Sequence, residues 1–303
     1  MTIILTLALF LSMSLPPSLL RNASYLANFF HEKCVQKTFV PTKHPEALRA
    51  LLCGEKITDV NLQENLQRTS LIHIFVISGS HLLLLDELLS ILRIPLSVRF
   101  VLFFFYSLVA SWQAPVVRAF LSLAIRAGLR LRALHLPPDL GVLITGLVTL
   151  VLFPTWWQSL SLQMSWCAAL ALCWGGLLRV RCSMLKIFLA QLAVFLLMTA
   201  PLWGFGSLHP LGILFNLFLA PIVAYALLPL SALAVFCSWG IVIFDAAMDL
   251  FLRLMPLLTE PVSLVRGAPS SSAWLWVWIF AWHCFMHLLR VSLWQGRDPA
   301  EAR

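Results

Sequence analysis

Long apolar segments follow one another along most of the chain, separated by short turns in which proline and arginine recur. The apolar segments lie near residues 71–92, 98–114, 116–131, 139–153, 156–178, 186–203, 208–238, 241–265 and 273–294. Many of them approach the ~20 residues that a helix needs to cross a bilayer. Because lipid offers the backbone no hydrogen-bond partner, such segments form helices. The pattern predicts an all-α polytopic membrane protein with about eight or nine membrane segments, some of them broken or re-entrant.

The same pattern divides the chain into four parts. Residues 1–20 predict an N-terminal membrane helix, since they lack the basic start and the small-residue cleavage site of a signal peptide. Residues 21–70 are a long polar stretch and predict a loop with short helices. Residues 71–294 predict a transmembrane domain, and residues 295–303 a polar tail.

Segment 241–265 differs from the other segments because it carries charge on one face. Asp245, Asp249 and Arg253 recur every fourth residue and can pair along a helix. An amphipathic helix at the membrane interface and a helix that crosses the membrane both fit this pattern. The sequence leaves these two alternatives open.

Composition excludes a soluble protein and raises the question of an anionic partner. The chain is 60% hydrophobic and 11% charged, with a mean hydropathy of +0.90, whereas soluble domains are about one quarter charged. Its net charge is +8. Two explanations fit this charge, namely basic loops on the cytoplasmic side of a membrane and attraction to a polyanion. Charge alone does not decide between them.

The positions of the basic residues predict how the chain is oriented in the membrane. Lys and Arg concentrate in alternate turns, at Arg93 and Arg99, at Arg126, Arg130 and Arg132, and at Arg179, Arg181 and Lys186. Because basic turns stay on the cytoplasmic side, we expect a cytoplasmic N-terminus and an extracytoplasmic loop at residues 21–70. The tail is then cytoplasmic, provided that segments 208–238 and 241–265 each cross the membrane once.

Two of the seven cysteines, Cys34 and Cys53, lie in the polar stretch. An oxidising compartment outside the cytoplasm would let them form a disulfide. The alternative is a pair of buried thiols beneath small helices. The other five cysteines lie in or beside apolar segments, where they are expected to pack as small hydrophobic residues.

The stretch 71-LIHIFVISGSHLLLLDELL-89 is apolar enough to enter a membrane, yet it holds His73, Ser78, Gly79 and His81. Ionisable residues inside a membrane segment normally face the protein interior or water. Gly79 permits the close approach of a second helix. A polar path through the membrane and an ordinary contact between helices both fit this stretch.

The order of motifs along the chain distinguishes it from an arbitrary membrane protein. The segment 69-TSLIHIFVISGSH-81 resembles a motif of the ComEC-type competence protein family, a membrane channel for DNA uptake in natural transformation. Its matching residues are Thr69, His73, Ile77, Ser78, Gly79 and His81. Further blocks match in the family's order, at Gly54 and Glu55, at Pro115, Arg118 and Ala119, at Gln163 and Ser165, and at Pro201, Phe205, Gly206, Gly212, Asn216 and Pro221. The chain is therefore identified as a member of this family, although Ser80 stands where the family has leucine.

The resemblance implies a channel, or a channel subunit, that passes single-stranded DNA inward across a bacterial inner membrane. The candidate DNA path consists of the matched polar residues His73, Ser78, Gly79, His81, Arg118, Gln163, Ser165 and Asn216. A strand needs cationic and polar partners, and Arg118 is the best single candidate. Alternatively, Arg118 reaches toward the outer interface, and Gln163 and Ser165 hydrogen-bond between helices.

Prolines within the matched blocks predict helix breaks. Pro115, Pro201 and Pro221 are the candidates. Asn216 together with Pro221 suggests a broken helix whose freed carbonyls take polar partners. The alternative at Pro221 is a kink in a continuous helix.

The resemblance covers only the membrane part of fuller family members. Those members also carry a metallo-β-lactamase-like domain, and its H-x-H-x-D-H motif does not occur in this sequence. We therefore expect no enzyme activity, no cofactor and no metal site on this chain. The implied partners are single-stranded DNA, the lipid bilayer, a separate nuclease, a DNA receptor and a cytoplasmic helicase or motor. A homo-oligomer also fits.

Two other classes of function remain open from the sequence. A small-solute or lipid transporter, or a degenerate family member without a transport role, would have no need of DNA. An intramembrane serine hydrolase would use Ser78 or Ser80 with a histidine from another helix, although Val76 stands where such enzymes carry glycine.

Overall fold

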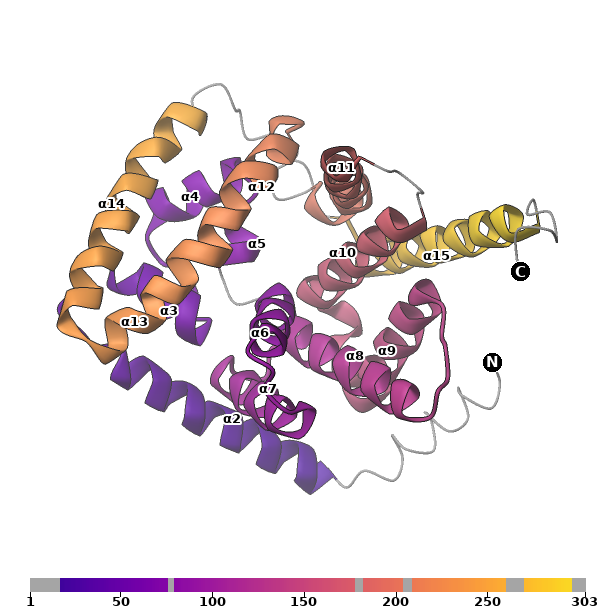
Figure 1. Ribbon diagram of the computed structural model, residues 1–303, viewed down its shortest axis with the longest axis horizontal. Helices are drawn as coiled ribbons and strands as arrows, with labels where there is room; N and C mark the ends of the chain where they lie inside the picture. Colours follow the sequence, from indigo (N-terminus) through magenta and orange to yellow (C-terminus); the bar gives the residue numbers. More distant parts are fainter. Residues whose placement is uncertain (1–16, 76–78, 178–181, 204–208, 260–269, 296–303) are drawn as a thin grey trace.

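The computed structural model describes residues 17–75, 79–177, 182–203, 209–259 and 270–295, and these residues form helices joined by short turns (Figure 1). The helices are α2 (Pro17–Lys37), α3 (Pro45–Cys53), α4 (Val60–Arg68), α5 (Ile72–Phe75), α6 (Gly79–Ile91), α7 (Leu96–Val109), α8 (Ala114–Leu131), α9 (Pro138–Leu152), α10 (Leu160–Leu177), α11 (Ser183–Leu202), α12 (Leu211–Ile222), α13 (Leu228–Phe236), α14 (Ser238–Thr259) and α15 (Ser272–Gln295), with a 3-10 turn, η1 (Pro154–Gln158), and a π turn, η2 (Val223–Leu227). Over these residues the all-α prediction is confirmed. The predicted tail and most of the predicted N-terminal membrane helix lie outside the described residues.

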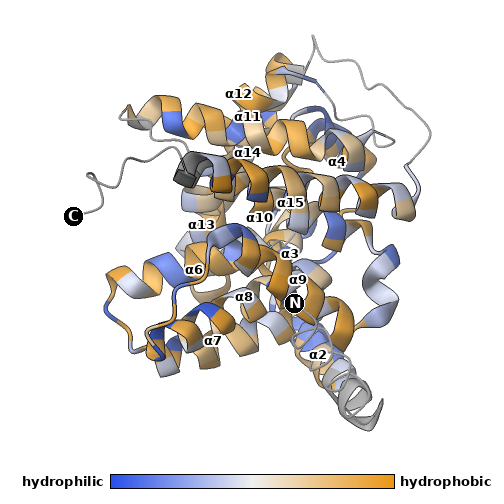
Figure 2. Ribbon diagram, turned by 90° about the vertical axis from the view of Figure 1, so that its right-hand side faces the viewer, coloured by the Kyte–Doolittle hydropathy of each residue, from blue (hydrophilic) through white to orange (hydrophobic). Residues whose placement is uncertain are grey.

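Several helices have the length and apolar composition of membrane segments. Met184–Leu202, Leu211–Phe236 and Ser272–Ser292 are long enough to cross a membrane, and three shorter apolar helices, α7, α9 and α10, accompany them. Large apolar side chains stay exposed on the outside of these helices, with Phe236 85% exposed, and hydrophobic residues dominate most helices in Figure 2. Exposed apolar surface on this scale marks a membrane-facing protein, so the chain is an all-α membrane protein.

The helices gather around two main cores, which lie on opposite sides of Figure 1. The first, here called the α14 lobe, consists of α3, α4, α5, α12, η2, α13 and α14. The second, here called the α10 lobe, contains α8, α9, α10, α11 and α15 and is centred on Trp166. The lobes meet where α11 packs against α12, while α2, α6 and α7 lie along the lower side of Figure 1.

Within the polar stretch 21–70, the short helices α3 and α4 form because each has one apolar face. Leu48 and Leu51 of α3 are fully buried, as is Leu66 of α4, and all three belong to the core of the α14 lobe. Asp59 caps the start of α4 by accepting hydrogen bonds from backbone N–H groups. Gly54 ends α3 with a φ of 75°, a left-handed conformation that glycine adopts without strain. The short helices α3 and α4 are therefore part of the α14 lobe, whereas residues 21–37, also predicted to be in a loop with short helices, belong to the long helix α2, which packs against α7.

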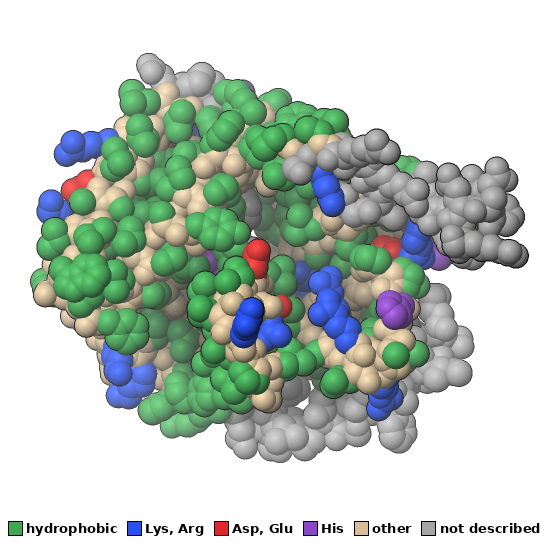
Figure 3. All heavy atoms as spheres, in the orientation of Figure 1, with side chains coloured by type: hydrophobic (Ala, Val, Ile, Leu, Met, Phe, Trp, Pro, Cys, Tyr) green, Lys and Arg blue, Asp and Glu red, His purple; other side chains and the backbone are tan. Residues whose placement is uncertain are grey.

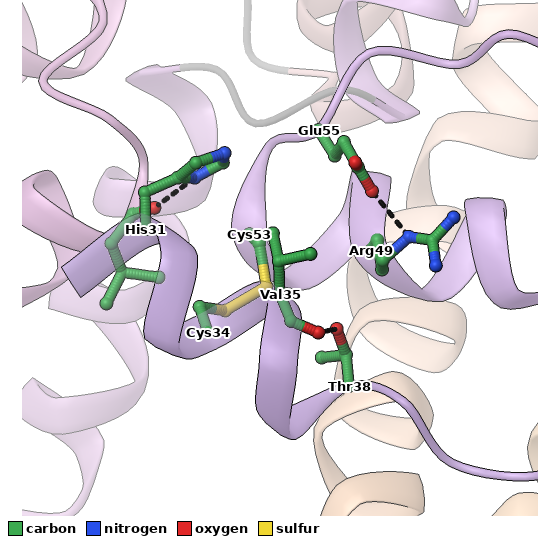
Figure 4. Close-up of a disulfide and its surroundings, with 8 residues drawn as sticks. His31, Cys34, Val35, Thr38, Arg49, Cys53 and Glu55 are labelled. Atoms are coloured by element: carbon green, nitrogen blue, oxygen red, sulfur yellow. Dashed lines mark hydrogen bonds and ion pairs between the residues drawn. A yellow bond between two sulfur atoms is a disulfide. The ribbon is translucent and has the colours of Figure 1, made fainter. Parts of the chain in front are cut away.

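A disulfide and several hydrogen bonds fasten this region (Figure 4). Cys34 of α2 and Cys53 of α3 are joined, with their Cα atoms 5.9 Å apart. His31 donates from Nδ1 to the carbonyl of Val109 at 3.0 Å, which ties α2 to the end of α7. The pairing that the sequence left open is thus present in the structure.

The acidic face of α14 contacts the polar stretch rather than pairing along its own helix. Asp245 accepts hydrogen bonds from the Thr42 hydroxyl and from the backbone N–H of Lys43. Asp249 accepts from His44 Nε2 at 2.8 Å and from Lys43 Nζ at 3.4 Å. The prediction of pairing along the helix therefore missed partners about 200 residues away in sequence. The placement of α14 at the membrane interface stays a prediction.

The helix break expected at Pro221 is absent. The chain stays helical from Leu211 to Phe236, and Pro221 lies inside α12. The π turn follows, in which the N–H of Leu228 donates to the carbonyl of Val223, five residues earlier. Proline lacks a backbone donor and its ring crowds the preceding turn, and a widened π turn ahead of Pro229 accommodates this without ending the helix.

Candidate functional site

Arg118 and Ser165, two residues of the predicted path, are in direct contact. Arg118 lies in the second turn of α8, is 7% exposed, and donates from Nε to the Ser165 hydroxyl of α10 at 3.0 Å. Pro115 occupies the first turn of α8, where its missing N–H costs no hydrogen bond, so it starts this helix. The residues beside Arg118, Val117 and Ala119, are fully buried. The helix thus holds a guanidinium inside an apolar core.

Arg118 has no acidic partner among the described residues. The ion pairs in that part of the chain involve other cations, such as Arg99 with Asp86 and Arg290 with Asp139. Its hydrogen bond to Ser165 engages only Nε, so the two terminal NH₂ groups keep their donors. A buried charge normally needs a paired opposite charge. This arginine is therefore able to bind an anion without first giving up a carboxylate.

Gln163 lies two residues before Ser165 in α10 and is fully buried. Its Nε2 donates to the backbone carbonyls of Trp157 and Ser272, both at 3.3 Å, which joins η1 to the start of α15. Its Oε1 accepts no hydrogen bond from the described residues. A buried amide oxygen left in this state is costly unless it receives a donor. Gln163 therefore has a structural role and one acceptor to spare.

Gly79 brings the start of α6 against the start of α8. A Cβ at this position would lie 2.9 Å from the carbonyl oxygen of Pro115 and 3.1 Å from Cβ of Ala119, so only glycine fits without a shift. His81, two residues later, is 2% exposed. This contact places the matched motif of residues 79–81 beside the first turns of the arginine-bearing helix.

The remaining histidine and serine of the motif are less fully described. His73 lies in α5 and Ser80 in α6, on either side of residues 76–78. Ser78 lies outside the described residues, so the structure does not test the serine hydrolase alternative in which Ser78 is the nucleophile.

Asn216 lies at a second place, between α10, α11 and α12. A cavity of about 30 Å³ there is lined by Ser70, Gln191 and Asn216 together with apolar side chains. This volume suits a single water molecule. The Oδ1 atom of Asn216 is buried and accepts no hydrogen bond from the described residues. No hydrogen bond or ion pair in that part of the chain links this cavity to Arg118, so the predicted path residues form separate groups.

Gln191 is a cavity residue that the sequence analysis missed. Its signal was a lone glutamine inside the apolar segment 186–203. Pro201, in the same helix, lies in the last turn of α11. The neighbouring carbonyl of Ala200 accepts a hydrogen bond from the Ser270 hydroxyl at 3.2 Å. Pro201 thus marks the end of a helix rather than a break within one.

A buried Trp–His pair supports the α10 lobe. Trp166 Nε1 donates to His283 Nε2 of α15 at 2.7 Å, so that nitrogen of His283 carries no proton. Any side chain at Gly146 of α9 would overlap the Trp166 ring. His283 itself is 7% exposed and hydrogen-bonded inside the bundle. The pair fixes the helix that carries Gln163 and Ser165.

Contacts at the two ends of α15 show which turns share an end of the molecule. Arg290, near the end of α15, pairs with Asp139 at the start of α9. At the other end of α15, Trp276 Nε1 donates to the carbonyl of Trp157 at 2.7 Å. The end of α15 therefore lies beside the start of α9, which follows the basic turn between α8 and α9.

The family model described as "Competence protein" matches residues 51–297. This match covers most of the chain and includes α4 to α15, so the chain belongs to the competence protein family. The resemblance drawn from the ordered motifs is confirmed. No curated protein and no solved structure matches the chain.

Proposed function

We propose that this member of the competence protein family is an inner-membrane channel, or a channel subunit, for the inward passage of single-stranded DNA. The observation that carries the proposal is Arg118, a buried guanidinium whose one hydrogen bond to the described residues goes to a neutral hydroxyl. Family membership supports a role in DNA uptake. Arg118 provides a positively charged partner for the phosphates of the strand inside an otherwise apolar bundle.

The chemistry of the site suits a passing phosphate. Each nucleotide carries one negative charge, and a guanidinium can donate two parallel hydrogen bonds to phosphate oxygens. Ser165 holds Nε of Arg118 and leaves both terminal nitrogens as donors. Oε1 of Gln163 and Oδ1 of Asn216 are spare acceptors for water or for base amino groups. The sites therefore offer polar partners that bind reversibly.

The orientation and partners follow from the same proposal. The basic turns lie in the cytoplasm, the 21–70 region lies outside, and the strand travels from the outside inward. A nuclease, a DNA receptor and a cytoplasmic helicase or motor act as separate proteins.

Transformation frequency tests the role of Arg118 in a naturally competent host that carries this chain as its sole copy. Arg118→Gln should lower the frequency about 10- to 100-fold, because a hydrogen bond to a charged group contributes about 1.5–3 kcal/mol. Arg118→Lys keeps the charge but loses the paired donors, so its transformation frequency should lie between those of the parent protein and of Arg118→Gln. Arg253→Gln, which removes an exposed arginine of the α14 lobe, should transform normally. Normal frequency in Arg118→Gln, at equal protein abundance, would refute the proposal.

Reconstitution separates a DNA channel from a transporter. The purified full chain in liposomes should release an encapsulated fluorescent oligothymidylate, and Arg118→Gln should release it more slowly. Passage of a small anion without the oligonucleotide would instead favour the transporter alternative and overturn the channel.

A further inference from the structure

Arg118 begins a ridge of polar residues along α8. Counting every fourth residue gives Arg118, Ser122, Arg126 and Arg130. Successive members of such a row are about 6 Å apart along the helix and form one ridge of its surface. The side chains become more exposed along the row. Arg118 is buried, Ser122 is half-buried, and Arg126 and Arg130 are exposed. The ridge thus leads from the apolar interior to the end of the helix.

The ridge faces α10. Arg118 bonds to Ser165, and Cys173 lies within electrostatic range of Arg126, Asp139 and Arg118. Arg118 and Arg126 are eight residues apart on α8, and Ser165 and Cys173 are eight residues apart in the same order on α10. The two helices therefore run in the same direction here. Ser165, Ala169 and Cys173 recur every fourth residue on the facing side and are only half-buried.

The charge of this ridge is not neutralised within the described residues. No carboxylate there forms an ion pair with Arg118, Arg126 or Arg130. Of the acidic residues at the same end, Asp139 pairs with Arg290 and Asp86 with Arg99, while Glu87 of α6 is exposed and forms no ion pair among the described residues. Figure 3 shows Lys and Arg side chains gathered over α6 and α8, near the centre of the face in view. The ridge therefore joins the buried arginine to a basic surface.

We propose that Arg118, Arg126 and Arg130 form a phosphate-binding ridge that guides the backbone of a single strand along α8 from the interior to the basic end. This inference rests on the function proposed above and adds its exit route. It differs from the ordinary role of basic residues near a membrane, which depends on the number of charges at one end and not on their place on a helix face.

Salt dependence of binding distinguishes these two roles. The full chain, purified in detergent, is titrated with fluorescent oligothymidylate over a range of salt concentrations. For single strands, the slope of log affinity against log salt falls by about 0.7 for each phosphate that the protein no longer neutralises. Arg126→Gln and Arg130→Gln should each lower the slope by about that amount, and Arg126→Lys should restore it. The matched control is Arg132→Gln, which removes an equally exposed charge just beyond α8 and should leave the slope unchanged.

Each outcome decides between the alternatives. An equal loss of slope in Arg132→Gln would show a diffuse charge effect and overturn the ridge. Unchanged slopes in Arg126→Gln and Arg130→Gln would also overturn it, whereas the proposed function would stand if Arg118→Gln still lowered the transformation frequency. If the ridge variants lose slope but Arg118→Gln transforms normally, the proposed channel fails and the ridge remains a nucleotide-binding surface.

Discussion

Asp245 in the α14 lobe and Arg118 in the α10 lobe are both buried, but their partners differ. In the α14 lobe, acidic side chains are satisfied by partners from distant elements, as Asp245 and Asp249 are by residues 42–44. In the α10 lobe, Arg118 has only a hydroxyl, and Oε1 of Gln163 has no partner among the described residues.

This difference indicates a division of roles. Satisfied polar groups make a lobe rigid and specify one arrangement, so the α14 lobe anchors the 21–70 region. Unsatisfied buried groups cost stability unless something else binds them. The α10 lobe is therefore where a polar substrate is expected, while its rigidity comes from aromatic packing around Trp166.

The largest effect on this comparison is expected from Trp166→Ala. Loss of a buried tryptophan costs about 3–5 kcal/mol, and His283 also loses its hydrogen-bond donor. Thiol labelling measures each lobe separately, in variants that keep the disulfide and one other cysteine. Buried Cys167 reports on the α10 lobe and Cys237, between α13 and α14, on the α14 lobe. Labelling of Cys167 should accelerate and that of Cys237 should not.

The control for this experiment is Trp157→Ala, because the Trp157 side chain is 46% exposed. It should leave both labelling rates near those of the parent protein. Equal acceleration at both cysteines in Trp166→Ala would show that the lobes unfold as one unit and would break the comparison.

Removal of the disulfide should have the next largest effect and should act on the α14 lobe. Cys34 and Cys53 are 19 residues apart, and closing a loop of that length stabilises a protein by about 3 kcal/mol. The double variant Cys34→Ser/Cys53→Ser should lower the melting temperature and expose Cys237 faster than Cys167. Reductant should reproduce the loss in the parent protein and do nothing further to the variant. If reductant lowered the melting temperature of the variant further, the effect of reductant would not come from this disulfide.

Glu46 gives the smallest and most specific test. Its carboxylate accepts hydrogen bonds from the Thr58 hydroxyl and from the N–H groups of Thr58 and Asp59. The Thr58 hydroxyl contributes most to lowering the pKa of Glu46 below its usual 4.5. A lowered pKa in the folded state adds stability that is present above about pH 4.5 and lost as pH falls through the folded value. The effect is small because the group lies near the surface.

Melting temperatures of the parent protein and of Glu46→Gln, compared from pH 7 to pH 3, check this sign. The parent should be the more stable at pH 7, and the difference should close in the acid range. A difference that stays constant with pH would mean that the carboxylate charge is not involved.

The sequence predicted helices better than it predicted contacts. Segments 116–131 and 139–153 correspond closely to α8 and α9, because a bilayer requires continuous apolar helices. The same rule does not specify which helices touch. Thr42 and Asp245 meet across 203 residues, and no local pattern indicates such a partner. The break predicted at Pro221 does not occur, since the chain stays helical from Leu211 to Phe236.

The sequence likewise predicted only part of the candidate site. Motif positions singled out Arg118 and Ser165, but their pairing across 47 residues emerged only from the packing of α8 on α10. The absence of a carboxylate beside Arg118 among the described residues could not be predicted from the sequence. The nearest acidic residues, Glu87 and Asp139, are 31 and 21 positions away, and only the packing of the helices decides whether they reach it. Packing around Gly146 and Trp166 was likewise invisible, because a small residue gives no signal of what fills the space beside it.

The π turn at residues 223–227 is equivalent to one residue inserted into a helix. The apolar face of the helix therefore follows one register before the turn and another after it. Deleting a single residue there would restore an α-helix and leave the downstream side chains on their present faces, whereas forcing the existing residues into α-geometry would rotate everything downstream by about 100°. Ser231 and Ala234, both buried, would then turn outward, and the exposed Phe236 would shift toward the core. The conformation of this turn is therefore as much a determinant of the α14 lobe as its composition.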